Sequence, residues 1–217
     1  MAENLLTVEN ITLRFGGVKA LTDVSFDILK GEIRAIIGPN GAGKSSMLNC
    51  INGFYHPQEG RITYKGQTRK QMRPYEAASQ GIARTFQNIA LFRGMSVLDN
   101  VTLALRKLRG CKRAQAEARA LHELDRLGLS AQRDQFPAQI SGGQKQRVAL
   151  ARALALKPDV LLLDEPFGAL DAKVRKELRR WLRHLHEQIS VTSIFVTHDQ
   201  EEAMEVSDQV VVMSQGR

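Results

Sequence analysis

The feature that most constrains how this chain folds is a glycine-rich turn between a short apolar run and a helical pattern. Residues 38–45, GPNGAGKS, fit the pattern G-x-x-x-x-G-K-[ST]. Residues 33–37 before the turn are typical of a buried strand, and residues 44–51 are typical of a helix. The glycines allow successive backbone N–H groups to point at one anion, and the helix N-terminus adds a favourable dipole. The sequence therefore predicts a phosphate-binding loop in an α/β fold.

The residues of this loop divide between phosphate binding and metal binding. The Lys44 ammonium can reach β- and γ-phosphate oxygens, and the Ser45 hydroxyl can complete the shell of a magnesium ion. A glycine-rich turn without a ligand is the alternative, but the strand before the turn and the helix after it favour a phosphate loop. The positions expected to contact the ligand are Gly38, Pro39, Asn40, Gly41, Ala42, Gly43, Lys44, Ser45 and Ser46.

A second apolar run ends in two adjacent carboxylates. Residues 160–165 read VLLLDE, and a buried strand that ends there presents Asp164 to a magnesium ion through its water shell. Glu165 comes one residue later, within reach of a water molecule that attacks the γ-phosphate. It is therefore the candidate general base or water-orienting group. Taken alone, the motif is also compatible with a strand end capped by solvated acids.

The order of these patterns predicts the fold. The first third alternates apolar and polar residues, as half-buried strands do, and residues 97–129 show a helical pattern. Fully apolar strands separated by helices indicate a parallel sheet covered on both faces. We expect an α/β phosphate-loop core with a mostly parallel sheet, an N-terminal antiparallel β region and an inserted helical subdomain. The expected single domain spans residues 1–217, with a core of about 1–89 and 157–217 and a helical subdomain of about 90–156.

The net charge of the chain excludes few classes of binding partner. With 31 Lys and Arg against 23 Asp and Glu, the formal net charge is +8, which admits nucleic acid, an anionic membrane surface or phosphorylated ligands. The basic residues gather at 106–113 and 173–183. The second group falls on a predicted helix of residues 172–188, where a solvated helix face is the simplest interpretation. Aromatic residues are not interleaved as in base-stacking surfaces, so no nucleic acid partner is expected.

Cysteine content and the length of apolar runs bear on the compartment. The two cysteines, Cys50 and Cys111, make neither a disulfide scaffold nor a zinc site, and neither indicates a redox role. No apolar run approaches the roughly 18 residues that span a bilayer. The start of the chain lacks a basic patch followed by an apolar stretch, so no signal peptide is expected. We expect a cytoplasmic location.

Three further motifs, taken together with the phosphate loop and the two adjacent carboxylates, indicate a family resemblance. SGGQ at 141–144, GALD at 168–171 and His198 follow the phosphate loop in the order seen in ATP-binding cassette (ABC) ATPases. SGGQ followed by ALARAL at 149–154 is the most specific element. Over essentially its whole length the chain resembles this family, which implies ATP and Mg²⁺ as ligands and hydrolysis of ATP to ADP and phosphate.

The resemblance implies roles for single residues. Phe15 lies where an aromatic side chain stacks on adenine, and Val18 is expected to pack beside it. Gln87, in RTFQ, corresponds to the glutamine that senses Mg²⁺ and the attacking water and links to the membrane subunit. His198 corresponds to the switch that contacts the γ-phosphate. The implied catalytic residues are Glu165, His198, Lys44 and Gln87, and the implied metal-binding residues are Ser45, Gln87 and Asp164.

A second anion site is expected at the SGGQ segment. Ser141 begins a predicted helix, where its hydroxyl and the free N–H groups can hold an anion. One chain with two anion sites but one lysine-bearing loop indicates a composite site. The resemblance implies a head-to-tail dimer, with an identical chain or a second ABC ATPase, in which this segment closes over ATP held by the partner. The implied contacts are Ser141, Gly142, Gly143 and Gln144, with Asp171 at the seam.

The two halves of the sequence resemble different importer ATPases. Residues 7–100, with FGGVKAL and ARTFQNIALFRGMSVLDN, are similar to ATPases of branched-chain amino acid importers. Residues from about 136 onward, with LLLDEPFGALDAK and FVTHDQEEAMEVSDQ, are similar to those of sulfate/thiosulfate importers. We therefore state the hypothesis of a composite chain (a recombinant, an engineered chimera or a natural mosaic) with a junction between about 100 and 136.

The expected function is that of the ATP-binding and ATP-hydrolysing subunit of an ABC importer for an amino acid or a sulfate-type solute. It would work with integral-membrane transporter subunits, peripheral on the cytoplasmic face of the inner membrane. Sulfate-type ATPases carry a regulatory domain after the ATPase, so such regulation is not expected in a chain that ends at Arg217. Two alternatives stay open: a soluble ABC ATPase without a transport role, and a composite ATP-binding scaffold without productive transport.

Overall fold

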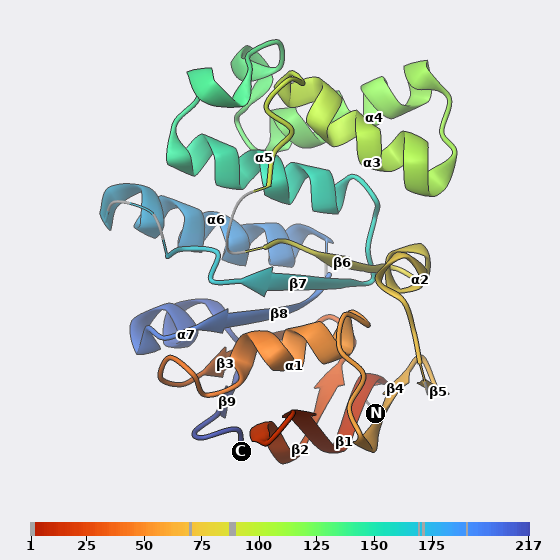
Figure 1. Ribbon diagram of the computed structural model, residues 1–217. Coiled ribbons are helices and arrows are strands. Elements are labelled where there is room, and N and C mark those ends of the chain that lie inside the picture. Colours follow the sequence, from red (N-terminus) through yellow and green to blue (C-terminus); the bar gives the residue numbers. More distant parts are fainter. Residues whose placement is uncertain (1–2, 70, 87–89, 169, 171, 190) are drawn as a thin grey trace.

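A five-stranded parallel sheet forms the middle of the protein (Figure 1). The computed structural model describes residues 3–69, 71–86, 90–168, 170, 172–189 and 191–217. In the order of the sheet, the strands are β6 (Ile82–Arg84), β7 (Val160–Asp164), β8 (Thr192–Thr197), β3 (Ile33–Ile37) and β9 (Gln209–Val212). All neighbouring strands pair in parallel, which confirms the predicted sheet. Their carboxyl ends consequently meet at one edge.

The central strands are buried on both faces of this sheet. In β7, Leu161 and Leu163 pack into one hydrophobic core, whereas Leu162 packs into the core on the opposite face. In β8, Phe195 likewise faces the first core and Ile194 the second. Residues 160–163 and 194–196 of these strands serve two cores at once, and this is why these runs show no polar alternation.

An antiparallel sheet forms a second layer. In order, its strands are β2 (Val18–Leu29), β1 (Asn4–Phe15), β4 (Glu59–Tyr64) and β5 (Gln67–Arg69). Helix α1 (Lys44–Ile51) lies between the two sheets and adds Met47 and Leu48 to the core they share. The predicted antiparallel β region is confirmed. Strand β5 was not predicted, because its residues are polar and partly exposed and it is defined by its pairing with β4.

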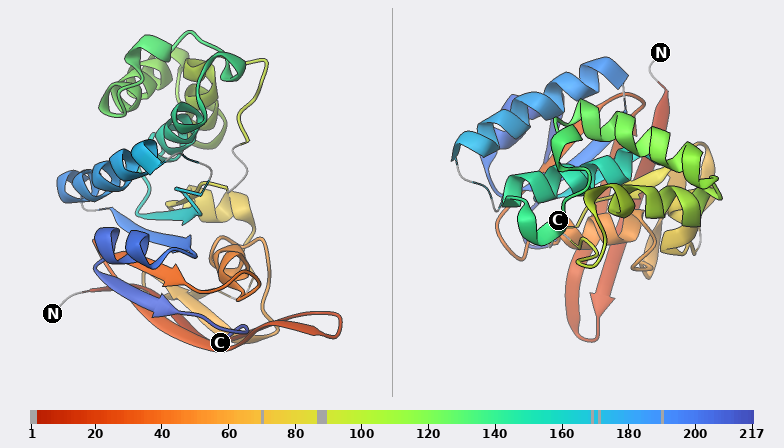
Figure 2. Two further views of the ribbon diagram at one scale, coloured as in Figure 1. Left: turned by 90° about the vertical axis from the view of Figure 1, so that its left-hand side faces the viewer. Right: turned by 90° about the horizontal axis from the view of Figure 1, so that it is seen from above.

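Three helices lie on the other side of the parallel sheet, two of them stacked on the third and away from the strands (Figures 1 and 2). They are α3 (Val97–Arg109), α4 (Arg113–Arg126) and α5 (Gly142–Leu154), with the 3-10 turns η1 (Ser130–Gln132) and η2 (Pro137–Gln139). Gly110, with a φ of 62°, ends α3 in the left-handed conformation and so divides the helical pattern predicted for residues 97–129. The short helix α2 (Pro74–Ser79) and strand β6 were not predicted, because both are too short to show a period.

Ion pairs join the last two helices, α6 (Ala172–Ile189) and α7 (Gln200–Val206). Three arginines spaced four residues apart on α6 each face an acid on or just after α7: Arg175 with Glu202 (3.8 Å), Arg179 with Glu205 (2.9 Å) and Arg183 with Asp208 (2.7 Å). The Arg179 side chain is only 13% exposed. The interpretation of this basic helix as a solvated face is therefore wrong for its side toward α7.

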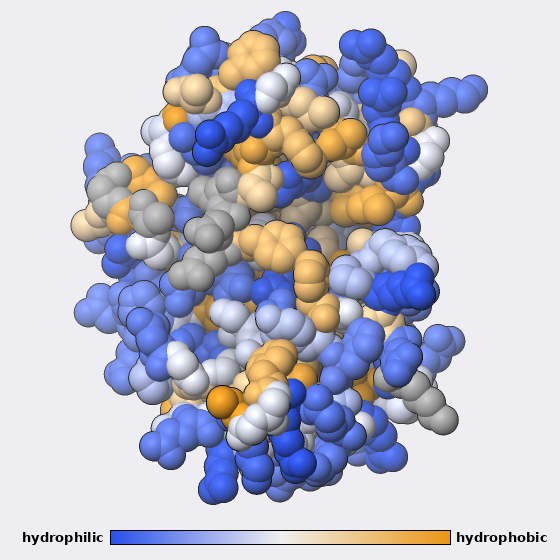
Figure 3. Space-filling model, in the orientation of Figure 1, coloured by the Kyte–Doolittle hydropathy of each residue, from blue (hydrophilic) through white to orange (hydrophobic). Residues whose placement is uncertain are grey.

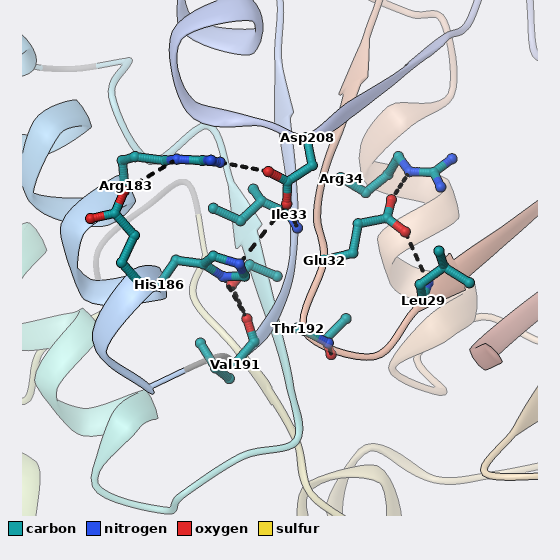
Figure 4. Close-up of polar contacts among 12 residues, drawn as sticks. Leu29, Glu32, Ile33, Arg34, Arg183, His186, Val191, Thr192 and Asp208 are labelled. Atoms are coloured by element: carbon teal, nitrogen blue, oxygen red, sulfur yellow. Dashed lines mark hydrogen bonds and ion pairs between the residues drawn. The ribbon is translucent and has the colours of Figure 1, made fainter. Parts of the chain in front are cut away.

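Asp208, between α7 and β9, ties the parallel sheet to α6 (Figure 4). Its Oδ2 accepts the N–H of Ile33 at 2.9 Å, and its Oδ1 accepts a hydrogen bond from Arg183 at 2.7 Å. His186 Nε2 lies 3.9 Å from the same carboxylate. Burial acts to raise the pKa of Asp208, but the hydrogen bonds from Ile33 and Arg183 outweigh burial, and the pKa is lowered.

Asp208→Asn is expected to lower the free energy of unfolding by about 1 kcal/mol at neutral pH, after allowance for partial exposure, because the amide loses charge-assisted hydrogen bonds. Since the folded pKa is lowered, the contribution of Asp208 is present above the unfolded pKa of about 3.9 and is lost as pH falls through the folded value. Urea unfolding at several pH values should therefore show a difference that shrinks on acidification.

The control for Asp208→Asn is Asp134→Asn, which removes a carboxylate from an exposed pair with Arg133. Exposed pairs contribute little, so this variant should unfold like the parent at every pH. Equal losses in the two variants would contradict the role given to Asp208.

Two further findings concern the cysteines and the lengths of the apolar helices. Cys50 and Cys111 are both free, and burial raises the pKa of the Cys50 thiol to about 12. Cys50 is therefore a buried core residue of α1 whose thiol stays protonated at neutral pH. In the part of the chain that the structure describes, no helix is both long and apolar enough to cross a membrane.

Candidate nucleotide-binding site

The loop between β3 and α1 wraps around the side chain of its own lysine. Lys44 is buried, and its Nζ donates hydrogen bonds to the carbonyl oxygens of Gly38 at 2.8 Å and Pro39 at 3.0 Å. These carbonyls satisfy the ammonium at the place where phosphate oxygens could do the same. The loop lies at the left in Figure 1, on the side of the carboxyl ends of β7 and β8.

Close packing behind the loop requires glycine at two positions. Gly43 has a φ of +92°, and a Cβ there would lie 2.6 Å from the carbonyl oxygen of Ala20 and 2.8 Å from Leu21 Cδ2. A Cβ at Gly38 would lie 2.1 Å from the carbonyl oxygen of Met213. The loop therefore curls in the narrow space between β2 and the segment after β9.

Gly43→Ala is expected to destabilise the protein by about 2 kcal/mol or more, because the methyl group meets a backbone carbonyl and the positive φ disfavours a side chain. ATP binding should weaken as well, since the loop N–H groups must move. Thermal unfolding and titration with a fluorescent ATP analogue measure the two effects. Gly94→Ala is the control, because a Cβ there meets nothing within 4 Å. Unaltered ATP binding in Gly43→Ala would refute the expectation.

Asp164, at the end of β7, joins this loop to β6. Its Oδ1 accepts a hydrogen bond from Ser45 Oγ at 3.0 Å, and its Oδ2 accepts one from Arg84 Nη2 at 2.7 Å. Arg84 also donates to Asn49 Oδ1 at 2.6 Å. The side chains of Arg84 and Asp164 are 6% and 7% exposed, so they form a buried ion pair.

The oxygen atoms around Asp164 suit a magnesium ion. Mg²⁺ usually keeps several waters and binds one or two protein oxygens together with substrate phosphates. The Ser45 hydroxyl and the Asp164 carboxylate supply two adjacent oxygens. Among the described residues, no group of three or more His, Cys, Asp or Glu side chains forms a metal site. The donor set therefore fits Mg²⁺ that is bound jointly with a nucleotide.

Glu165, directly after β7, has a left-handed backbone with a φ of +45°. Its N–H donates to the carbonyl oxygen of Val196 at 3.1 Å, which holds the turn against β8. Its Oε1 lies 3.8 Å from Nδ1 of His198, the residue that follows β8. A non-glycine residue in this conformation costs about 1–2 kcal/mol, and such strain gathers at functional sites. The structure thus brings together two residues of the predicted catalytic set.

Ser141 caps the N-terminus of α5, as predicted. Its Oγ accepts the N–H of Gln144 at 3.2 Å, and Gln144 Oε1 accepts the N–H of Ser141 at 2.8 Å. Gly142 is exposed, whereas a Cβ at Gly143 would lie 2.6 Å from Val174 Cγ1 on α6. The segment therefore presents a capped helix N-terminus at the surface, pressed against the start of α6.

The hairpin between β1 and β2 carries the residues predicted to contact adenine. Phe15 and Val18 are 46% and 68% exposed. The Phe15 ring meets the edge of the Tyr55 ring, with centroids 4.9 Å apart. Tyr55 was missed in the sequence, where the aromatic pair in FYHP after the predicted helix was the available signal. Together the two rings, inclined by 74° to each other, offer apolar contact surface to a base.

Comparison with known proteins decides the family. The profile of the ABC transporter family matches residues 21–168, which is more than half of the chain. The chain belongs to the ABC transporter family. The order of the motifs in the sequence predicted this family.

Curated ABC relatives match nearly the whole chain. The sulfate/thiosulfate import ATP-binding protein of Thermosynechococcus vestitus is 50% identical over 212 residues, which cover 98% of this chain and 62% of the relative. The corresponding protein of Rhizobium meliloti is 52% identical over 213 residues, which cover 96% of this chain and 60% of the relative. The chain thus spans about three fifths of the length of these relatives.

Solved ABC structures confirm the fold. A dimeric post-hydrolysis state of an ATP-binding cassette bound to ADP and Pi has a TM-score of 0.86 and 33% identity, covering 98% of this chain and 95% of the other. A nucleotide-free ATP-binding cassette from an ABC transporter has a TM-score of 0.86 and 29% identity, covering 99% of this chain and 89% of the other.

Two residues of the expected site lie outside the described part of the chain, and two arginines that join segments of the fold were missed. Gln87 and Asp171, which the resemblance placed in the site, lie outside the described residues. Arg84 was missed, although a charged residue before TFQ was a visible signal. Arg152, within ALARAL, was missed too: it donates to the carbonyl oxygen of Ala90 at 2.8 Å, and burial lowers its pKa. It therefore fastens α5 to the chain after position 89.

Hydrophobic side chains cross the middle of the face that carries α1 and β6 (Figure 3). Phe54, after α1, and Phe86, after β6, are both about half exposed, and their rings meet edge to face with centroids 6.2 Å apart. The Arg84 guanidinium lies 5.1 Å from the centre of the Phe86 ring. Arg84 therefore contacts both this aromatic face and Asp164 of the ABC site.

Proposed function

We propose that this chain binds Mg²⁺ and ATP and hydrolyses ATP to ADP and phosphate, as one ABC ATPase domain with a helical subdomain of about residues 90–156. The observation that carries the proposal is the approach of Glu165 to His198, 3.8 Å apart, beside the hydrogen-bonded pair of Ser45 and Asp164. A carboxylate, an imidazole and two magnesium-compatible oxygens thus gather at the sheet edge that holds the phosphate loop.

The phosphate loop is proposed to hold the triphosphate, and the β1–β2 hairpin the base. Lys44 exchanges its two carbonyl acceptors for β- and γ-phosphate oxygens. Ser45, Asp164 and Gln87 would hold Mg²⁺, which neutralises phosphate charge when it is bound. The proposed nucleotide contacts within the chain are Phe15, Val18, Gly38, Pro39, Asn40, Gly41, Ala42, Gly43, Lys44, Ser45 and Ser46.

Phosphoryl transfer to water needs positioning and charge neutralisation more than covalent chemistry. Glu165 orients the attacking water and accepts its proton. His198 donates a hydrogen bond to a γ-phosphate oxygen, and Lys44 neutralises charge that builds on the same oxygens. The 3.8 Å separation of Glu165 and His198 allows both side chains to reach one γ-phosphate.

A second chain is proposed to complete each site. In a head-to-tail dimer, Ser141, Gly142, Gly143 and Gln144 of one protomer close over ATP that the phosphate loop of the other holds, with Asp171 at the seam. Support comes from the surface position of the capped Ser141 helix end and from the dimeric state of the similar cassette bound to ADP and Pi. The second chain is an identical copy or another ABC ATPase.

Phosphate release per molecule, measured against protein concentration, tests the ATPase and the dimer together. The rate per molecule should climb with concentration, because two chains complete each site, and should vanish in Glu165→Gln. A flat, near-zero rate alongside normal ATP binding would overturn the composite site. A constant, substantial rate at all concentrations would support a site completed within one chain.

We infer that the transported solute is sulfate or thiosulfate. The support is about 50% identity, over nearly the whole chain, to sulfate/thiosulfate import ATP-binding proteins. The comparisons show neither a junction between two halves nor an amino acid cargo. Integral-membrane subunits would dock on the aromatic face around Phe54 and Phe86, at the cytoplasmic face of the inner membrane.

Uptake of labelled sulfate in cells that lack their own sulfate-import ATPase subunit tests the cargo. The chain should restore sulfate uptake, and Glu165→Gln should not. A parallel assay measures leucine uptake in cells without a branched-chain ATPase subunit. Restoration of leucine uptake alone would favour the amino acid importer. Failure to co-purify with any membrane subunit would favour a soluble role.

A further inference from the structure

Arg175, in the first turn of α6, bridges two segments that carry site residues. Its Nη2 donates to the carbonyl oxygen of Leu170 at 3.2 Å, in the connection from β7 to α6. Its Nε lies 3.8 Å from Glu202 Oε1, in the first turn of α7. One guanidinium therefore contacts both the segment that follows Glu165 and the helix that follows His198.

The second oxygen of Glu202 holds the turn that carries His198. Thr197 Oγ1 donates a hydrogen bond to Glu202 Oε2 and accepts one from the N–H of Asp199 at 3.1 Å. Thr197 and Glu202 are 2% and 4% exposed, so water cannot readily replace these partners. The backbone on both sides of His198 is thus tied to one buried carboxylate.

Glu202 relies on neighbouring arginines because it is buried. Burial raises the pKa of Glu202, and the charges of Arg175 and Arg179 act in the opposite direction. A buried carboxylate is costly unless it is paired with a cation and hydrogen-bonded. Loss of Arg175 would remove one of these cations and, at the same time, release the Leu170 carbonyl.

Short contacts lead away from each of the two proposed catalytic side chains. The N–H of Gly168 donates to the carbonyl oxygen of Glu165 at 3.2 Å, and His198 Nδ1 lies 3.8 Å from Glu165 Oε1. On the side of β7, Glu165 contacts Gly168; contacts also run from Leu170 through Arg175 and Glu202 to Thr197, the residue before His198. Arg175 joins the start of α6 to the start of α7, in addition to the direct bond from the Glu165 N–H to the Val196 carbonyl oxygen.

We propose that Arg175 is a positioning residue that sets the separation of His198 from Glu165 during ATP hydrolysis. The inference rests on the proposed ATPase function and deepens it. Arg175 acts through the Leu170 carbonyl on one side and through Glu202 on the other. Its loss should therefore slow the chemical step more than it weakens ATP binding.

Steady-state kinetics of Arg175→Met test the proposal, with Arg180→Met as the matched control at an exposed position of the same helix. In Arg175→Met, kcat should fall roughly 10- to 100-fold while KM for ATP stays near the parent value. Arg175→Lys keeps the charge but cannot span both contacts, so it should recover thermal stability more than kcat. A parent-like kcat in Arg175→Met, or a change in KM alone, would overturn the proposal.

A double-mutant cycle separates positioning from a general loss of stability. If Arg175 acts through His198, Arg175→Met should cause no further loss of rate in a His198→Ala background. Fully additive losses would contradict the proposal, because they would mean that the two residues act independently.

A third measurement does not depend on hydrolysis. The imidazole NMR signal of His198 in the nucleotide-free protein, assigned by its absence in His198→Gln, should shift in Arg175→Met and not in Arg180→Met. An unshifted His198 signal in Arg175→Met would be enough to overturn the proposal that Arg175 positions His198. A parent protein without ATPase activity would instead count against the proposed function, and the NMR comparison would still decide whether Arg175 positions His198.

Discussion

Glu165→Gln is expected to reduce ATP hydrolysis by about 100-fold or more while ATP binding persists. Glutamine matches glutamate in size and can adopt the same left-handed turn, so the site keeps its shape. Its amide cannot accept a proton from the attacking water, however. Phosphate release measures the loss of rate, and equilibrium titration with a fluorescent ATP analogue measures binding separately.

The matched control is Glu187→Gln, which neutralises an exposed acid on α6. This variant should hydrolyse ATP like the parent, since its carboxylate is about 60% exposed and forms long surface pairs. Parent-like hydrolysis in Glu165→Gln would remove Glu165 from the catalytic set. It would also leave the strained turn at this position without a catalytic explanation.

Arg84→Met is expected to lower the free energy of unfolding of the nucleotide-free protein by about 3–5 kcal/mol. The substitution leaves the Asp164 carboxylate, 7% exposed, without its buried cation and leaves Asn49 Oδ1 without a donor. Mg²⁺ and ATP should restore more stability to this variant than to the parent, because Asp164 then faces a new positive charge. Thermal unfolding with and without Mg²⁺ and ATP measures both effects.

Arg84→Lys is the conservative comparison for this ion pair. It keeps a positive charge beside Asp164 but cannot span Asn49 and Asp164 with a planar guanidinium, so an intermediate loss is expected. If Arg84→Met unfolded at the parent temperature, the Arg84–Asp164 pair would have no net stabilising role. Equal stabilisation of Arg84→Met and of the parent by Mg²⁺ and ATP would mean that Asp164 does not bind the metal.

The parts of the fold that could be predicted from sequence are those with strong local patterns. Strand β7 is apolar up to Asp164 at its end, and the turn before α1 has glycine where the chain must curl. Strand β5, in contrast, contains Gln67, Thr68 and Arg69, and it becomes a strand by pairing with β4. No local pattern carries that information, because the partner strand supplies the hydrogen bonds.

Residues of the candidate site could be predicted from the sequence where they lie within one loop or at the end of one strand. Lys44, Ser45 and Asp164 belong to such segments. The partner of Asp164 lies 80 residues away, and sequence alone does not show that Arg84 ends the strand beside it. Pairing between α6 and α7 is a similar case, since a charged helix face looks the same whether solvent or another helix covers it.

The left-handed glutamate after β7 has a consequence for directed evolution of this protein. Glycine, and to a lesser degree asparagine, adopts that conformation with less strain. A library screened for heat resistance alone should therefore accumulate glycine or asparagine at position 165. The selected proteins would be more thermostable but would no longer hydrolyse ATP. A library screened for turnover should retain glutamate there and compensate elsewhere. The residue recovered at position 165 would thus show whether the screen had selected for thermal stability or for ATP turnover.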